Sequence, residues 1–501
     1  MVSTLLLAGC GANAGSVSSV PSHPAGPHDW PTYGHDAQHT FHGSTALTVT
    51  TAGKLRQAWF FPTGDAVTAT PTVVNGTVYA GSWDGYFYAV DLATGALRWK
   101  YRLRPQHAVT PYPGQNPRDT TSDGGLVTSS AWYEAGDGSR PDLVVFGGGY
   151  TLYALDAETG APYWAHDYTG RPEAPSDPNR DGTRVFSSPV VVGGNVVFGV
   201  DVDGSKGYRG YVVAANLATG RPVWEHQTDV DGSGRIQNDG CGNVWSSGTV
   251  LPRSGLVVFD VADCNFANPP PLSESVVAFH VGDGRVAWVF RPARADALCD
   301  LDFGATPNAG IDAGGRTSFL GVGGKDGTYY SLDPNTGRQR WATNVVFGGF
   351  SGGFIATTAF DGRRVYGSTA LGDFGRFEHG TKVFCDAGNP RDLAVQEPSV
   401  HSFDAMTGTI AWQAEKAASF SATTVAGGMT FNGPALATPV LDVRLASTGR
   451  LIDQVALPQA NWSGVATVGN AVVLGVGSTY NAAHAGIVVL TPGGSRPVVR
   501  G

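Results

Sequence analysis

Charged and sulfur-containing residues are scarce in this sequence, and long apolar runs are missing. Asp, Glu, Lys and Arg make up 15% of the 501 residues, and there are only three Met and five Cys. So low a charge argues against helical bundles and coiled coils. The net charge of −9 leaves no basic surface for nucleic acid, which we exclude as a partner. No apolar run reaches the roughly 18 residues that cross a bilayer.

The first ten residues, MVSTLLLAGC, form a short apolar run that ends in Leu-Ala-Gly-Cys. This pattern is similar to a bacterial lipoprotein signal, in which Cys10 is acylated and becomes the mature N-terminus. A basic start is missing, so we expect the true start upstream. Residues 1–10 are interpreted as a signal remnant, and residues 11–44 as a flexible tether and N-terminal segment. We expect an exported lipoprotein, attached by its lipid to the outer side of the cytoplasmic membrane or in the periplasm.

Four cysteines remain after Cys10, an even number that predicts two disulfides in an exported protein. Three connectivities are open, and proximity in the sequence favours Cys241 with Cys264 and Cys299 with Cys385. No C-x-x-C-H motif is present, so no c-type haem is attached to this chain. The four cysteines are Cys241, Cys264, Cys299 and Cys385.

Glycine is abundant, at 70 positions, and it belongs to a repeat typified by YALDAETGAPYW. The alternating residues indicate a strand, Asp-x-x-Thr-Gly a tight turn, and the residues up to Trp a second strand. A degenerate copy at 443–454 lacks the Trp. The units end at Trp99, Trp164, Trp224, Trp288, Trp341 and Trp412.

A further strand pair precedes each unit, and four strands repeated radially predict an all-β fold, a β-propeller. The C-terminus supplies only three strands of a last blade, while residues 51–61 resemble a lone fourth strand. We therefore predict that residues 45–501 form an eight-bladed β-propeller of four-stranded antiparallel blades, closed by an N-terminal strand. Closure removes the exposed sheet edge that invites aggregation.

Loop lengths distinguish the two faces of this propeller. Turns between the first and second, and the third and fourth, strands of a blade are short and define a turn face. The remaining connections hold the long insertions and define a loop-rich face. We expect function on the loop-rich face because loops on a rigid scaffold carry most binding sites. The insertions are 101–124, 165–185, 225–243, 261–275 and 368–400.

Together with DWPTYGHDAQHT (29–40), NVWSSGTV (243–250) and DLDFGATPN (300–308), the repeats resemble pyrroloquinoline-quinone (PQQ) dehydrogenase propellers. The polyvinyl-alcohol and other alcohol dehydrogenases are the branch they resemble most. This resemblance implies that Lys325 contacts the quinone oxygens and that Trp245 is the surface on which the flat cofactor stacks. It further implies a catalytic Asp that takes the alcohol proton. Asp300 and Asp302 are both candidates for that role.

The family also holds Ca²⁺ beside the quinone, through a Glu before "RGY" and an Asn in a "GTGN" loop. Ser205 stands near the Glu position here, and Cys264 or Asn265 near the Asn position; Asp203 and Asp263 are alternative donors. The family's adjacent-cysteine disulfide is absent.

Independently of the resemblance, a segment from Asp177 to Gly182 fits the head of a calcium-binding loop. Asp177, Asn179 and Asp181 would supply oxygen ligands at alternate positions, although Ser188 stands where the closing Glu belongs. The alternative is an ordinary polar turn that binds no metal. Segment 229–234 is a weaker match to the same calcium-loop pattern. His35, His39 and His42 form a separate candidate and would bind a metal only if their segment were helical.

Two functions from different classes follow. One is a PQQ-dependent alcohol dehydrogenase that oxidises a small-molecule or polymeric alcohol and passes electrons to an external acceptor. The other is a cofactor-free scaffold that binds a protein or polymer on its loop-rich face. A pocket holding Lys325, Trp245 and an Asp, with a metal nearby, would favour the enzyme.

Overall fold

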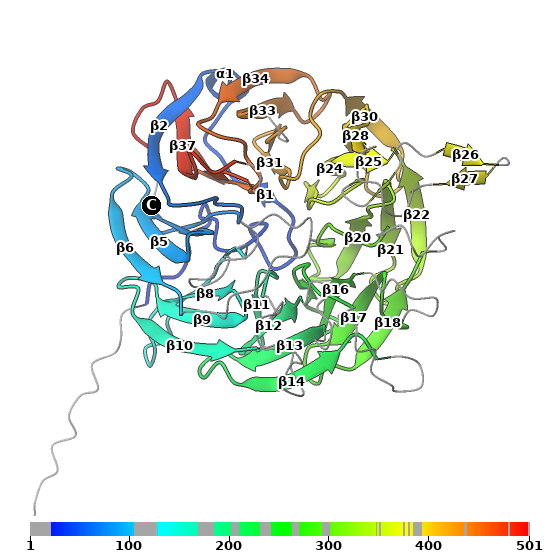
Figure 1. Cartoon of the computed structure of the whole chain (residues 1–501), viewed down its shortest axis with the longest axis horizontal. Helices are drawn as coiled ribbons and strands as arrows, with labels where there is room; N and C mark the ends of the chain where they lie inside the picture. Colours follow the sequence, from blue (N-terminus) through cyan, green and yellow to red (C-terminus); the bar gives the residue numbers. More distant parts are fainter. Residues whose placement is uncertain are drawn as a thin grey trace, which may run out of the picture.

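The described part of the computed structural model forms eight sheets arranged radially around one axis (Figure 1). Each sheet has four antiparallel strands, and one carries a fifth, so the predicted eight-bladed propeller is confirmed. The described residues are 22–104, 127, 129–168, 185–201, 210–230, 242–262, 270–292, 301–346, 348–349, 352–373, 376–378, 381–383, 393–434, 438–478 and 481–498.

Blades are numbered along the chain, and their strands run from the axis outward. Blades 1 to 4 contain β3 (Thr72–Val74), β4 (Thr77–Gly81), β5 (Tyr86–Asp91), β6 (Leu97–Arg102); β7 (Trp132–Glu134), β8 (Leu143–Gly148), β9 (Thr151–Asp156), β10 (Pro162–Asp167); β11 (Val190–Val192), β12 (Asn195–Val200), β13 (Tyr211–Asn216), β14 (Pro222–Gln227); and β15 (Thr249–Leu251), β16 (Leu256–Val261), β17 (Ser275–His280), β18 (Val286–Phe290).

Blades 5 to 8 follow the same plan, with β1 added in parallel to the inner edge of blade 7. They contain β19 (Asn308–Ile311), β20 (Thr317–Gly323), β21 (Thr328–Leu332), β22 (Gln339–Asn344); β23 (Ala359–Phe360), β24 (Arg364–Ser368), β29 (Val400–Asp404), β30 (Ile410–Ala414); β1 (His42–Gly43), β31 (Thr424–Ala426), β32 (Met429–Asn432), β33 (Val440–Leu445), β34 (Leu451–Ala456); and β35 (Val465–Val468), β36 (Ala471–Val476), β37 (Gly486–Pro492), β2 (Leu55–Pro62).

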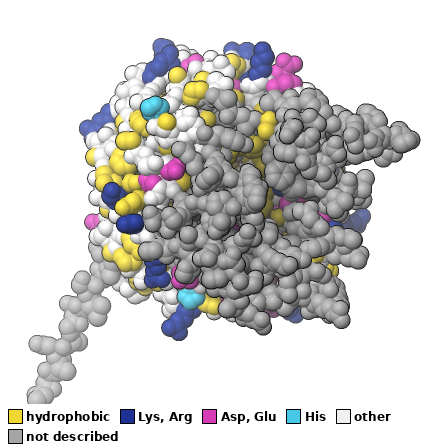
Figure 2. Space-filling model, in the orientation of Figure 1, with side chains coloured by type: hydrophobic (Ala, Val, Ile, Leu, Met, Phe, Trp, Pro, Cys, Tyr) yellow, Lys and Arg dark blue, Asp and Glu magenta, His cyan; other side chains and the backbone are white. Residues whose placement is uncertain are grey.

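In blade 8 the outer strand β2 comes from the N-terminal side and pairs antiparallel with β37 from the C-terminal side. An insertion in blade 6 adds β25 (Leu371–Asp373) paired with β28 (Leu393–Val395). It also adds β26 (Arg376–Glu378) and β27 (Thr381–Val383), a hairpin that projects outward in Figure 1. On the described rim in Figure 2, basic and acidic side chains are interspersed with apolar ones.

Neighbouring blades are locked together by the Trp of one outer strand and the turn glycine of the next blade. The indole ring of Trp164 lies so close to Gly220 that a Cβ on this glycine would be 2.5 Å from the ring. The indole Nε1 also donates to the carbonyl of Leu217, at 2.8 Å. The same arrangement repeats at Trp59–Gly95, Trp99–Gly160, Trp224–Gly284, Trp288–Gly337, Trp341–Gly408 and Trp412–Gly449.

The interface between blades 7 and 8 differs, because Asp453 stands four residues after Gly449, where the other blades have Trp. A helical turn, α1 (Val49–Ala52), packs there instead. Leu47, Ala52 and Leu55 are buried in one apolar cluster with residues of β33 and β34. The N-terminal segment thus supplies the apolar contacts that the degenerate repeat lacks.

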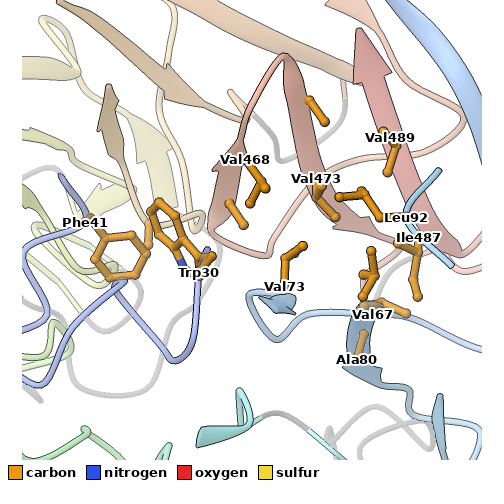
Figure 3. Packing of buried hydrophobic residues seen from close by; sticks show 14 of the residues in the cluster. Trp30, Phe41, Val67, Val73, Ala80, Leu92, Val468, Val473, Ile487 and Val489 are labelled. Carbon is orange, nitrogen blue, oxygen red and sulfur yellow. The ribbon is translucent and has the colours of Figure 1, made fainter. Parts of the chain in front are cut away.

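The segment 30–43 runs around the inner edges of the blades on the turn face. Trp30 and Phe41 are fully buried and lie close together beside Val73 and Val468 (Figure 3). Burial of two aromatic rings here fixes a segment that has almost no regular secondary structure of its own. Backbone hydrogen bonds join it to Val73, Tyr133, Val250, Ala309, Phe360 and Val425 on the inner strands of blades 1, 2, 4, 5, 6 and 7.

The Trp–Gly contact predicts a difference between two glycines of blade 3. Gly194 and Gly220 have φ of +79° and +68°, so Ala at either costs roughly 1–2 kcal/mol in left-handed backbone strain. No atom lies within 4 Å of a Cβ at Gly194, whereas a Cβ at Gly220 meets the Trp164 ring. Gly220→Ala should therefore lose about 1–3 kcal/mol more than Gly194→Ala. Urea unfolding midpoints measure this, and equal losses would refute the interlock.

Candidate functional site

A cavity of about 210 Å³ lies on the propeller axis, lined by the residues that lead into the inner strands. In seven of the eight blades, all except blade 2, two described lining positions recur two residues apart. The first position is nearer the loop-rich face, and the second begins the approach to the inner strand. Because these seven blades contribute the same two positions, the described cavity wall consists of two stacked layers of side chains.

The second position forms a belt of hydroxyl groups that joins successive blades. The backbone N–H of Ser188 donates to the Ser247 hydroxyl at 2.9 Å, and that of Ser247 to the Thr306 hydroxyl at 3.0 Å. Ser130 and Thr357 extend the belt from blade 2 to blade 6. Blades 7 and 8 carry Ala422 and Gly464 at this position. The belt satisfies buried N–H groups that the sheets leave over.

The first position supplies most of the apolar wall. Trp245 in blade 4 and Trp462 in blade 8 belong to opposite blades of the ring, as do Phe186 in blade 3 and Phe420 in blade 7. Phe420 and Trp462 lie with ring centroids 4.9 Å apart. Gly304 takes this position in blade 5, where a Cβ would lie 3.1 Å from Cη2 of Trp245. The wall therefore suits a ligand with a flat aromatic face.

The N-terminal segment borders this cavity on the side of the turn face. Tyr33 lines the cavity, and its hydroxyl lies 2.8 Å from the Thr357 hydroxyl. Burial raises the pKa of the Tyr33 phenol, which stays protonated. His39 is fully buried, and its ring nitrogens face the carbonyls of Tyr33 and Gly248 at 2.8 and 3.0 Å. The N-terminal segment thus occupies the side of the cavity nearer the turn face.

Lys325, Asp302 and Trp245 lie together, although 57 and 80 residues separate Trp245 from the other two. The Lys325 Nζ is 2.6 Å from Asp302 Oδ1, and their side chains are 8% and 1% exposed. The same Nζ lies 5.5 Å from the centroid of the Trp245 ring. Neither Asp302 nor Lys325 is among the described residues that line the axial cavity. They flank Trp245, so this ring adjoins both the ion pair and the cavity.

The turn that holds Lys325 has a structural counterpart in blade 1, where Trp83 takes the same place. In both turns an Asp three residues after the strand accepts a hydrogen bond from a Tyr hydroxyl: Asp84 from Tyr88 and Asp326 from Tyr330. The backbone of each turn bonds to the approach of its own inner strand in the same way. The turn is thus a structural element of the blades, and only the Lys side chain is special to blade 5.

Several predicted residues lie outside the described part of the chain. These are Asp300, the calcium-loop residues Asp177, Asn179 and Asp181, and all five cysteines, Cys10, Cys241, Cys264, Cys299 and Cys385. Segment 30–43 is not helical, so His35, His39 and His42 do not share a helical face. Within the described ranges, no group of three or more His, Cys, Asp or Glu residues is placed to hold a metal. No described helix is long and apolar enough to cross a membrane.

The residues that the sequence analysis missed are Phe186, Phe420, Trp462 and Tyr33. Three of them share the position of Trp245, two residues before the belt position of their own blade. Alignment of the units on the small residue (Ser, Thr, Ala or Gly) that stands at the belt position before each inner strand would have revealed these positions. Tyr33 carries no such signal, because its segment lies outside the repeat.

The fold and the site define the class of this protein: an eight-bladed β-propeller with an axial cavity that an N-terminal segment borders on one side. The family model for the PQQ-type glucose/ethanol/alcohol dehydrogenase β-propeller domain matches residues 30–345, more than half of the chain. The chain belongs to this family.

Named relatives are similar over most of this chain. Polyvinylalcohol dehydrogenase of Sphingopyxis sp. (strain 113P3) is 24% identical over 411 residues, which cover 74% of this chain and 56% of the relative. The dehydrogenase subunit of alcohol dehydrogenase (quinone) of Komagataeibacter europaeus is 26% identical over 401 residues, 72% and 51% of the two chains. The chain therefore spans about half the length of these curated relatives.

The fold also matches solved structures. Quinohemoprotein alcohol dehydrogenase from Comamonas testosteroni superposes with a TM-score of 0.71 at 18% identity. The match covers 95% of this chain and 82% of that one. At this identity the likeness shows the shared fold alone.

A buried histidine behind the Lys325 turn predicts a pH dependence of stability. His401 packs against Phe354, whose N–H donates to Gly324. Burial lowers the pKa of His401 to about 3. The unfolded chain, with an ordinary value of about 6.5, binds the proton first, so stability falls as the pH falls from about 6.5 toward 3.

Between pH 7 and 5 this histidine should remove about 2 kcal/mol from the free energy of unfolding. His401→Gln should lack that loss, measured by urea unfolding at both pH values. His484 is exposed, so His484→Gln is the control and should keep the slope of the unmodified protein. An unchanged slope in His401→Gln would contradict the assignment.

Proposed function

We propose that this protein is a PQQ-dependent dehydrogenase that oxidises an alcohol at the end of the axial cavity nearer the loop-rich face. The observation that carries the proposal is the juxtaposition of Trp245, Lys325 and Asp302. Membership of the family supports it, as do relatives named polyvinylalcohol dehydrogenase and alcohol dehydrogenase (quinone). The substrate class is a small-molecule or polymeric alcohol, and the electrons pass to an external acceptor.

The described residues fit PQQ, a flat quinone that carries carboxylates. The Trp245 ring offers a face for stacking, and Lys325 places a cation beside the same ring. Gly304 has no Cβ, so position 304 does not crowd the Cη2 edge of the Trp245 ring. When bound, PQQ would supply the acceptor for two electrons from the alcohol.

Lys325 and Asp302 have distinct roles in this proposal. The Lys325 ammonium stabilises negative charge that develops on quinone oxygens. Asp302 is almost fully buried and paired with Lys325, so its carboxylate holds the ammonium in place and acts as a positioning group. Asp300 is then the candidate base for the alcohol proton, on the strength of the family resemblance alone.

Titration of the purified chain with PQQ tests this proposal, followed by absorbance and thermal shift, with and without Ca²⁺. We expect saturable binding, and Lys325→Ala should weaken it about tenfold or more because a buried charge-assisted contact is lost. Lys100 is the matched control: its Nζ also lies over an aromatic ring, Tyr86, at 4.8 Å, but on an outer strand. Lys100→Ala should bind like the unmodified protein.

If PQQ binds neither with nor without Ca²⁺, the dehydrogenase proposal is refuted. The cofactor-free scaffold, which binds a protein or polymer on the loop-rich face, would then be the better description. Binding that Lys325→Ala leaves unchanged would keep the cofactor and refute the role of Lys325. A requirement for Ca²⁺ would support a metal beside the quinone.

We further propose that the protein is exported and anchored through an acylated Cys10. Residues 22–29 meet the propeller on the turn face: the Ser22 hydroxyl donates to Gly136, and the N–H of His23 donates to Asp142. An anchor attached there would keep the turn face toward the membrane and the loop-rich face away from it. Expressed from its own locus, Cys10→Ser should lose fatty-acid labelling; equal labelling would refute the anchor.

A further inference from the structure

A recess of about 440 Å³ opens on the turn face, where blades 4 and 5 meet. The turn between β15 and β16 supplies Arg253, and the turn between β19 and β20 supplies Asp312 and Arg316. Arg340 on β22 and Asn335 in the turn before it complete one side. All described lining residues are polar, and no apolar wall is present among them. This recess lies on the face opposite the loops that hold Lys325.

The protein itself holds the three guanidinium groups in place. Arg253 Nη1 donates to the carbonyl of Gly314 at 3.2 Å, and Arg316 Nε donates to Asp312 Oδ2 at 3.0 Å. Arg340 donates to the carbonyl of Ser318 at 2.9 Å and to Asp333 at 3.1 Å. A guanidinium has five N–H donors, so these bonds orient each group and leave most of its donors for a ligand.

The charge of the recess is opposite to that of the whole chain. Three cations and one carboxylate line it, and the Asp333 carboxylate pairs with Arg340, so one positive charge remains in excess, whereas the chain as a whole carries −9. The Asp312 carboxylate accepts hydrogen bonds from the backbone N–H groups of Gly314 and Arg316 as well as from the Arg316 side chain. The Asp312 carboxylate therefore stabilises the turn and orients Arg316. The N–H donors that remain in the recess belong mainly to the guanidinium groups.

We propose that this recess binds an oxyanion of the phosphate or sulfate type. Planar guanidinium groups match such oxyanions with paired N–H donors, more closely than an ammonium does. The side-chain amide of Asn335 adds a further N–H donor to the lining. A ligand with a large apolar part would find no matching wall. The inference is independent of the proposed dehydrogenase activity, because no residue of the recess belongs to the axial site.

Such a phosphate group can come from a free ion or from a lipid headgroup. The headgroup is a candidate because residues 22–29, which follow the proposed lipid anchor, meet the same face. Calorimetric titration of the full chain with inorganic phosphate, at constant ionic strength set by chloride, tests the free ion. Cosedimentation with phosphatidylglycerol vesicles, against phosphatidylcholine vesicles, tests the headgroup. In whichever arm binding occurs, Arg253→Ala combined with Arg316→Ala should weaken it about tenfold or more.

Arg285 provides the control, because it lies in a neighbouring turn of the same face, outside the recess, and is paired with Asp283 at 2.7 Å. Arg285→Ala should leave binding unchanged, and unfolding midpoints should show that all variants fold. The proposal is overturned if phosphate gives no more binding heat than chloride and if vesicles sediment the double variant and the unmodified protein to the same extent. Equal weakening by Arg285→Ala would also overturn it, since general surface charge would then explain the binding.

Discussion

The contact between a Trp indole and the turn glycine of the next blade is the constraint on which the ring depends. Each blade is a small sheet that cannot bury both of its faces alone, so its stability comes from its neighbours. The indole covers the glycine and donates to a carbonyl three residues before it, which fixes the rotation between the two blades. Because the contact repeats, small errors in rotation do not accumulate, and the last blade meets the first in register.

The axial site inherits its geometry from that ring. Trp245 and Asp302 stand just before the inner strands of adjacent blades, and Lys325 stands on a turn at the end of a middle strand. The hydroxyl belt then ties the approaches of these inner strands to one another. The position of each site residue therefore depends on contacts of blades that carry no site residue. The N-terminal segment borders the cavity on the turn face, where Tyr33 lines it.

The sequence was sufficient for the parts of this fold that are local and repeated. Asp-x-x-Thr-Gly specifies a turn by its own side-chain and backbone geometry. The seven copies of this unit, with a last blade shared between the two ends of the chain, predicted eight blades. The packing of residues 30–43 could not be foreseen, because its hydrogen bonds go to six blades far away in the sequence. The pairing of Lys325 with Asp302 was missed for a related reason: the resemblance treated each residue as a partner of the cofactor, not of the other.

The pairing of Lys325 with Asp302 is also the main support for the proposal that blade 5 contributes to a ligand site. In blade 1 the same turn holds Trp83, an apolar side chain that suits a buried position. Replacing an indole by a lysine at such a place costs free energy, because the ammonium loses water and needs a carboxylate that also loses water. A purely structural propeller gains nothing from this exchange. A site that must present a fixed cation beside a flat ring does gain from a lysine there. The free-energy cost of burying the Lys325–Asp302 pair thus points to Lys325 as a functional residue.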